Sequence, residues 1–249
     1  WRIPLLVHEQ NVQLGRANRL LTRWADRLAV SFVQTTGERR AARNDGSPMP
    51  RSAPVLTGLP IRSVIGSCSR ERAAERFGFD VARPTLLVVG GSQGASAIND
   101  LLIRTLASVS EEERRAWQVI HLTGAKDEAR VKAAYAAAGM RAHVAPCLAE
   151  MDAAYAHADV VIARAGASTI AELARCAKPS ILIPYPLANG HQRANAQLVD
   201  DVGGGMVLEE AHATPERLLG GIRQLLRDGA LRERMGCGVR TLSVPDAAA

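Results

Sequence analysis

Short apolar runs alternate with longer amphipathic segments along most of this chain. A short apolar run between turn residues predicts a buried strand, and apolar positions three and four residues apart predict a helix. The expected strands lie at residues 3–7, 28–32, 86–89, 119–122, 143–148, 160–163, 181–183 and 207–208. The expected helices lie at residues 15–29, 70–77, 97–107, 126–138, 151–156, 169–176, 191–199 and 215–227. Because strand and helix follow each other at short spacing, the pattern predicts an α/β fold with a parallel, doubly wound sheet.

A polar stretch divides this pattern into two unequal parts. Residues 34–54 are rich in Gly, Pro and Arg, which is typical of a loop, and an extended segment follows at residues 55–62. Pro60 restricts its own φ and pushes Leu59 into an extended conformation. We therefore expect a linker here between two domains, residues 1–61 and residues 62–249. Arg62, at the end of the linker, could be an ordinary salt-bridge partner or could bind a diphosphate in bidentate fashion.

Composition narrows the class of protein. The chain has 249 residues, of which 47% are hydrophobic and 22% charged, as in a globular protein. The formal charge of +6 favours an anionic partner such as a nucleotide, an acidic lipid or a nucleic acid. The arginines are dispersed and lack interleaved aromatic residues that could stack on bases, which argues against nucleic acid. The four cysteines show no C-x-x-C spacing, so we expect neither a zinc site nor a disulfide framework.

The N-terminal part carries a possible membrane contact. Arg16, Arg19, Arg23 and Arg27 would form one stripe of a helix at residues 15–29, beside a flank that includes Trp24. Such a face could rest on an anionic membrane surface, or it could simply be solvated. No apolar run approaches the roughly 20 residues that a membrane-spanning helix needs. The chain begins within an apparent strand, and we expect it to be a fragment that lacks an N-terminal segment.

The stretch from Ala163 to Asn195 is the most informative for chemistry. A strand at residues 160–163 is followed by Gly166, where we expect the backbone to turn sharply and to approach a ligand closely. Two good N-cap residues, Ser168 and Thr169, come next. A helix that starts there presents free N–H groups and a positive dipole end, which suits a phosphate. Glu172, one turn into the helix, could accept hydrogen bonds from a sugar diol. A polar loop at residues 189–192 should lie at the same edge of the sheet.

Two further strand ends carry candidate ligand residues. A glycine-rich turn at residues 90–95 follows a strand, but it matches neither G-x-G-x-x-G nor a Walker loop. It could bind phosphate or be a plain tight turn. His8, Glu9, Gln10 and Asn11 follow the first strand, where α/β proteins place ligand sites, although a capped loop explains them equally well.

Together, these motifs occur in the order and spacing of one known family. The motifs are residues 8–11, 58–62, 90–95, 164–169, Glu172 and residues 191–196. In this respect the chain resembles the MurG family, the peptidoglycan enzymes that add N-acetylglucosamine to lipid I. Each motif is weak alone, but six in order are specific, and the resemblance extends from Ile3 to about Asp246.

The resemblance implies a fold and a set of donor contacts. The fold would be GT-B, with two Rossmann-like parallel-sheet domains. Residues 1–61 would be part of an incomplete N-terminal domain for acceptor and membrane, and residues 62–249 would bind the donor, UDP-N-acetylglucosamine. Asn11 and Gln192 would contact the donor sugar, Arg62 and Ser92 the diphosphate, and Leu148 the uracil. The helix start under the phosphates would consist of Ala167, Ser168, Thr169, Ile170 and Ala171, with Glu172 on the ribose hydroxyls.

The resemblance also implies a reaction. It would be the inverting transfer of N-acetylglucosamine to the 4-hydroxyl of the muramoyl sugar of lipid I, giving lipid II, by a peripheral protein on the cytoplasmic face of the bacterial cell membrane. A general base is needed, and His8 and Glu9 are the candidates. Arg62 and a helix N-terminus would stabilise the leaving diphosphate. The chain has no Asp-x-Asp motif, so we expect no protein-bound metal and no tightly bound cofactor.

Departures from the family leave alternatives open. The glycine-rich loop that begins such proteins is absent, as is a final helix that returns to the first domain. We therefore expect the chain to keep donor recognition and to lose most acceptor binding. One alternative is the UDP-sugar-binding half of a split glycosyltransferase that needs a partner chain. Another is a UDP-sugar 2-epimerase, although the chain lacks an obvious set of acidic and histidine residues for that reaction.

Overall fold

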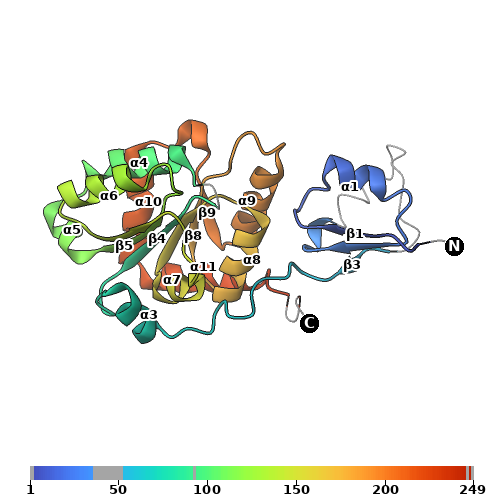
Figure 1. Cartoon of the computed structure of the whole chain (residues 1–249), viewed down its shortest axis with the longest axis horizontal. Coiled ribbons are helices and arrows are strands. Elements are labelled where there is room, and N and C mark those ends of the chain that lie inside the picture. Colours follow the sequence, from blue (N-terminus) through green and yellow to red (C-terminus); the bar gives the residue numbers. More distant parts are fainter. Residues whose placement is uncertain (1–2, 36–52, 92–93, 245–246, 248–249) are drawn as a thin grey trace.

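Two separate parallel sheets organise the chain (Figure 1). The structure, a computed structural model, describes residues 3–35, 53–91, 94–244 and 247. The smaller sheet has the order β1-β2-β3. It consists of β1 (Leu6–Glu9), β2 (Arg27–Val30) and β3 (Val55–Leu56), with α1 (Arg16–Leu21) between the first two strands.

The larger sheet has six strands in the order β6-β5-β4-β7-β8-β9, and every neighbouring pair is parallel. Its strands are β4 (Thr85–Val89), β5 (Gln118–Leu122), β6 (Arg141–Ala145), β7 (Val160–Ala163), β8 (Ser180–Leu182) and β9 (Gly205–Val207). The helices around it are α3 (Arg70–Phe77), α4 (Ser96–Leu106), α5 (Glu111–Ala116), α6 (Glu128–Ala137), α7 (Met151–His157), α8 (Ala167–Cys176), α9 (His191–Asp201), α10 (Pro215–Arg227) and α11 (Gly229–Arg240), with a 3-10 turn at Glu210–His212. The predicted parallel, doubly wound α/β fold is confirmed.

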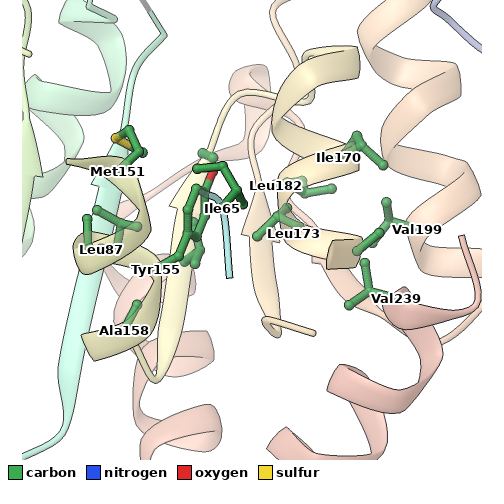
Figure 2. Close-up of a cluster of buried hydrophobic side chains, with 14 of the residues drawn as sticks. Ile65, Leu87, Met151, Tyr155, Ala158, Ile170, Leu173, Leu182, Val199 and Val239 are labelled. Atoms are coloured by element: carbon green, nitrogen blue, oxygen red, sulfur yellow. The ribbon is translucent and has the colours of Figure 1, made fainter. Parts of the chain in front are cut away.

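Helices cover both faces of the larger sheet, because alternate residues of its strands point to opposite sides. Leu87 and Val161 belong to the core on one face, whereas Val88 and Ile162 belong to the core on the other. Figure 2 shows the first of these cores, in which side chains from α7, α8, α9 and α11 meet those of β4 and β8. Strands buried on both faces explain the continuous apolar runs of the sequence.

The predicted elements of the smaller sheet need correction. The expected helix at residues 15–29 ends at Leu21, and β2 begins at Arg27 because this segment pairs with β1 along its whole length. The first strand begins and ends later than expected, so His8 and Glu9 belong to β1 itself. The first two residues of the expected linker form β3, which pairs with β2. Most of the expected loop at residues 34–54 lies outside the described residues.

Two helices of the larger domain were not predicted, although their start signals are present in the sequence. Helix α5 begins with a capping box in which Ser110 accepts from the N–H of Glu113 and the Glu113 carboxylate accepts from the N–H of Ser110. Helix α11 is preceded by its N-cap residue Asp228, whose carboxylate accepts from the N–H of Leu231. The predicted domain boundary at residues 61 and 62 falls in the extended chain between β3 and α3, and the division itself stays a prediction.

The strand order places a ligand-binding position in the larger sheet. The chain proceeds from β4 outward to β5 and β6, and then returns to the other side of β4 with β7, β8 and β9. The last residues of the two central strands, Val89 and Ala163, are paired. In sheets of this kind, ligands bind beyond the carboxyl ends of the strands at the point where the order reverses. The turns after β4 and β7 therefore flank the expected crevice.

Candidate functional site

The N-terminus of α8 lies at this crevice, directly after β7. Gly166 is the N-cap residue, and no side chain caps the helix. The expected caps, Ser168 and Thr169, were wrong, because the helix begins earlier and both residues lie in its first turn. Burial of Ala167 and Ile170 in the core sets this earlier start. Ser168 is exposed, so the helix tip is not sealed by its own side chains.

Gly94, in the turn after β4, and Gly166, in the turn after β7, differ in whether the fold requires a glycine. Gly94 has φ 77°, and a Cβ there would lie 2.2 Å from the carbonyl oxygen of Thr123, so the fold itself requires glycine. Gly166 has φ −69°, and its Cβ would meet nothing closer than 3.7 Å. Its backbone does not need glycine, contrary to our expectation of a sharp turn, but the space beside it is open. Ser92 lies outside the described residues.

Glu172 is half-buried and is held by a buried phenol. Tyr155 of α7 is fully buried, and its hydroxyl donates to Oε2 of Glu172 at 2.9 Å. Burial raises the pKa of Glu172, and the Tyr155 hydrogen bond and the charge of Arg62 oppose that rise. The carboxylate is therefore bound by a side chain of the core, and its contact with a ligand stays a prediction. Tyr155 was not singled out from the sequence, because its spacing resembles that of any core residue of a helix.

Arg62 and Leu148 lie close together. The guanidinium of Arg62 donates to the carbonyl oxygen of Ala149 at 2.7 Å, next in sequence to Leu148. Arg62 is exposed, so most of its donors face solvent. Leu148 is partly buried against the core that contains Tyr155. The structure thus brings Arg62, Leu148 and Glu172 to one region.

Glu9 organises the loop that follows β1. Its Oε1 accepts from the backbone and side-chain N–H groups of Asn11 at 2.9 and 3.2 Å. Its Oε2 accepts from the N–H of Gly15 at 2.8 Å and from the amide of Asn18 at 2.9 Å. Burial by itself raises the pKa of Glu9, but these hydrogen bonds outweigh it and hold the pKa below its usual value. A carboxylate with both oxygens engaged is a poor proton acceptor, so its geometry favours a structural role.

His8, the other candidate base, is half-buried at the end of β1. Its Nε2 lies 3.2 Å from the carbonyl oxygen of Gly58 and 3.3 Å from the hydroxyl of Ser31. Facing a carbonyl, Nε2 carries the proton, and the neutral ring then has its lone pair on Nδ1. His8 is therefore the stronger of the two candidates, and its role stays a prediction.

Helix α9 carries a third set of polar groups, two of which bond to neighbouring segments. Gln192, in its first turn, accepts from the N–H of Tyr185 at 2.9 Å. Asn195, one turn later, is completely buried and bonds to both Asn11 and Ala165. Figure 1 shows α8 and α9 on the side of the larger domain that faces the smaller sheet. Asn195 lies within a motif noted in the sequence, but no pattern indicated that it reaches the other sheet.

The remaining predicted residues are less available to a ligand. The side chain of Ile170 lies in the core, as Figure 2 shows, and its N–H donates to the carbonyl of Gly166 at 3.0 Å. Ala167 is buried as well, so any contact with it would involve its backbone. Ala171 and Arg62 line a cavity of about 360 Å³, together with linker residues and with residues 242–244 and 247. A larger cavity of about 530 Å³, beside α4, contains none of the predicted residues.

The described part of the chain has neither a cluster of metal-ligating side chains nor a membrane-spanning helix. There, no group of three or more His, Cys, Asp or Glu side chains is arranged to hold a metal ion. None of the described helices is both long enough and apolar enough to cross a bilayer.

A doubly wound parallel sheet with an uncapped helix N-terminus at its switch point is typical of α/β proteins that hold ligands beyond the carboxyl ends of their strands. Comparison with known families is more specific. The family model described as "Glycosyltransferase family 28 C-terminal domain" matches residues 85–248. The chain belongs to glycosyltransferase family 28.

Individual relatives agree with this assignment. The UDP-N-acetylglucosamine--N-acetylmuramyl-(pentapeptide) pyrophosphoryl-undecaprenol N-acetylglucosamine transferase of Desulfotalea psychrophila is 38% identical over 99% of this chain and 63% of its own length. The protein of the same name from Sorangium cellulosum is 41% identical over 99% of this chain and 57% of its own length. The crystal structure of Acinetobacter baumannii MurG superimposes with a TM-score of 0.75 at 29% identity, covering 98% of this chain and 65% of that one. The fold is therefore GT-B, and the chain spans less than two thirds of these relatives.

Proposed function

We propose that this chain supplies the donor-binding part of an enzyme that transfers N-acetylglucosamine from UDP-N-acetylglucosamine to lipid I, giving lipid II in peptidoglycan synthesis. The names of the relatives support this substrate pair. The observation in the chain itself that carries the proposal is the juxtaposition of an uncapped helix tip and Glu172, which Tyr155 holds one turn into that helix.

The diphosphate would lie at the N-terminus of α8. The first N–H groups of a helix and its dipole attract an anion, and the exposed Ser168 adds a hydroxyl beside them. Arg62 reaches the same region from the linker, where its charge influences Glu172. Two sources of positive charge can stabilise the diphosphate as it leaves, so we propose that the reaction needs no protein-bound metal.

The nucleoside and the sugar would then occupy opposite sides of this tip. Glu172 would accept hydrogen bonds from the ribose hydroxyls, since a carboxylate accepts and a diol donates. The uracil would lie against the backbone near Leu148. The donor sugar would face Asn11 and Gln192, whose side chains come from the smaller sheet region and from α9.

The chemical step would be a single displacement. The 4-hydroxyl oxygen of the muramoyl sugar forms a bond to the anomeric carbon while the bond from that carbon to the UDP oxygen breaks. The configuration inverts, UDP leaves with the electron pair, and the hydroxyl proton passes to a base. His8 Nδ1 is the candidate acceptor for this proton, because the hydrogen bonds of Glu9 make its carboxylate weakly basic.

We also propose a peripheral position on the cytoplasmic face of the cell membrane. Leu20, Leu21 and Trp24 are exposed beside a series of arginines, and the guanidinium of Arg23 lies over the ring of Trp24. Apolar side chains flanked by arginine suit an interface with anionic lipid.

A second candidate is the UDP-sugar-binding half of a split glycosyltransferase. The observation in its favour is the set of exposed apolar side chains on the smaller sheet, including Leu6, Val55 and Leu56. Such a chain would co-purify with a small membrane protein when expressed in its natural host. Isolation of the tagged chain without any such protein would count against this reading.

The proposal is tested by calorimetric titration of the purified chain with UDP-N-acetylglucosamine, UDP and 2′-deoxy-UDP. We expect binding of the first two and weaker binding of the deoxy compound. Glu172→Gln should weaken UDP by about 10-fold, because hydrogen bonds to a charged group contribute about 1.5–3 kcal/mol, and should reduce the preference for ribose. Glu233→Gln, an exposed change on α11, is the matched control. Absence of any heat at millimolar UDP-N-acetylglucosamine would remove donor binding from the proposal.

A further inference from the structure

Asn195 is a buried amide that joins the two sheet regions. It is 0% exposed, and it lies one turn after Gln192 on α9. Its Oδ1 accepts from the N–H of Val12 at 3.0 Å, which connects α9 to the loop after β1. Its Nδ2 donates to Oδ1 of Asn11 and to the carbonyl oxygen of Ala165, each at 3.0 Å. One side chain therefore links the loop after β1, the turn after β7 and α9.

Asn11 is consequently held at both ends of its amide. Its Nδ2 donates to Glu9, and its Oδ1 accepts from Asn195. Glu9 is itself 2% exposed and anchored by Gly15 and Asn18. A half-buried amide with both ends bonded cannot flip, so the orientation of its remaining donor and acceptor sites is determined.

We propose that Asn195 is a positioning residue for the donor sugar, which acts by orienting Asn11 across the interface of the two sheet regions. The proposal rests on the proposed function, in which Asn11 faces the donor sugar. It adds that the sugar site is built by a residue of the larger domain that is too deeply buried to touch the sugar. Gln192 and Asn195 lie three residues apart on one face of α9, so one helix supplies both a direct contact and the support for another.

The chemistry of the site explains why an amide is needed. Asn195 uses two donors and one acceptor, and aspartate would keep only acceptors. A carboxylate would then face the oxygens of Asn11 and Ala165 without hydrogen atoms between them. The turn after β7 has other support, because Arg164 N–H donates to Val89 and Ile183 N–H donates to Ala163. Loss of the Asn195 amide should therefore disturb Asn11 more than the helix tip.

The test compares the affinities of UDP-N-acetylglucosamine and UDP in the full chain. UDP lacks the sugar, so it reports the helix tip and Glu172 without Asn11. We expect Asn195→Asp to weaken UDP-N-acetylglucosamine about 10-fold, the effect of losing one or two buried hydrogen bonds, while UDP changes less than about 2-fold. Gln197→Ala, an exposed change on the same helix, should change neither affinity.

A second, milder variant keeps the test decisive if aspartate prevents folding. Asn195→Ser retains a hydroxyl and should show the same selective loss to a smaller degree. In the Asn11→Ala background, Asn195→Ser should cause no further loss of UDP-N-acetylglucosamine affinity, because the residue on which it acts is gone. An equal loss of both ligands, or additive losses in the double variant, would overturn the positioning role while leaving the proposed function intact. If the unaltered chain binds neither ligand, the proposed function fails, and this inference fails with it.

Discussion

The two sheets of this protein differ in how completely their apolar side chains are covered. The larger sheet has an extensive buried core on each face, whereas the smaller sheet has one cluster of four buried residues, Val7, Ala25, Leu28 and Val30. Of the twelve large hydrophobic side chains that are exposed in the described residues, eight lie between residues 3 and 56. The same kind of apolar run thus forms strands in both regions, but it builds a self-sufficient core in only one.

The difference follows from the number of layers. Helices cover both faces of the larger sheet, while the described part of the smaller sheet is packed against α1 and has only three strands. Three short strands with a small core have little stability of their own. We therefore expect the smaller sheet to open more readily than the larger one.

The largest expected effect tests this difference directly. Ile162→Ala, in the central strand β7, should lower the free energy of unfolding by about 2–5 kcal/mol and weaken amide protection throughout β4–β9, because it leaves a cavity in a core that cannot close around it. Leu28→Ala, at an equally buried position of β2, should weaken amide protection in β1 and β2 alone. The measurement is denaturant unfolding combined with hydrogen exchange. If Leu28→Ala reduces protection in β4–β9 to the same extent, the two sheets unfold as one unit.

The next effect is a dependence of stability on pH within the larger domain. Neutral His121 donates from Nε2 to Asn99 at 2.9 Å and accepts at Nδ1 from the Tyr135 hydroxyl at 3.1 Å. Burial lowers the pKa of His121 to about 3. Protonation at Nδ1 would remove the acceptor of the Tyr135 hydroxyl and place a positive charge in a buried site. Because the folded pKa lies below the unfolded one, stability is full above about pH 6.5 and declines as pH falls, by up to about 1.4 kcal/mol per pH unit.

Unfolding free energies at pH 7.5, 6.5, 5.5 and 4.5 would measure this slope. In His121→Gln the dependence of the unfolding free energy on pH should be weaker, by up to the contribution of one proton, which is about 1.4 kcal/mol per pH unit. The variant should also be less stable at neutral pH. The comparison with the variant subtracts the contributions of other histidines. Identical slopes in the two proteins would show that His121 is not the group that titrates.

The smallest expected effect concerns two helix ends of the larger domain. Helices α3 and α8 both end in the left-handed conformation, α3 with Gly78 at φ 64° and α8 with Ala177 at φ 51°. Ala177→Gly should raise the free energy of unfolding by about 0.5–1 kcal/mol, since it relieves the strain of a Cβ at positive φ. Gly78→Ala should lower the free energy of unfolding by a similar amount, because a Cβ there meets no atom within 4 Å and strain alone would act. Thermal unfolding of both variants gives the check, and effects of the same sign would contradict the explanation.

Most of the larger domain was predictable because its local signals agree with each other. The apolar runs of β4, β5 and β7 are bounded by glycine or polar turns, and the parallel arrangement followed from their alternation with helices. The smaller sheet was predicted less well. Trp24 continues the helical period of Leu20 and Leu21 beyond the true end of α1 at Leu21, but the chain leaves the helix there because β2, which follows, pairs with β1. Helical periodicity contains no information about a strand with which the segment could pair instead.

In the candidate site, too, some residues were predictable from local sequence and others were not. The helix start after β7 and Glu172 were singled out from their spacing after a strand, and the structure places the start of α8 directly after a strand at the switch point of the sheet. That this helix start binds an anion stays a prediction. Tyr155 and Asn195 were not recognised as part of the site. Tyr155 is 17 residues from its partner Glu172, and Asn195 is 184 residues from Asn11. No periodicity connects residues at such separations.

The order of apolar and polar residues along the chain was enough to specify strands, helices and the edge of the sheet at which ligand groups gather, because these depend on neighbours a few positions away. The hydrogen-bond partners of each candidate carboxylate depended on the packing of distant segments. Glu9 and Glu172 are both carboxylates near predicted ligand loops, yet Glu9 accepts from four donors, while Glu172 accepts from the hydroxyl of Tyr155. That distinction is absent from local sequence, because hydrogen-bond geometry and burial arise only when separate elements come together.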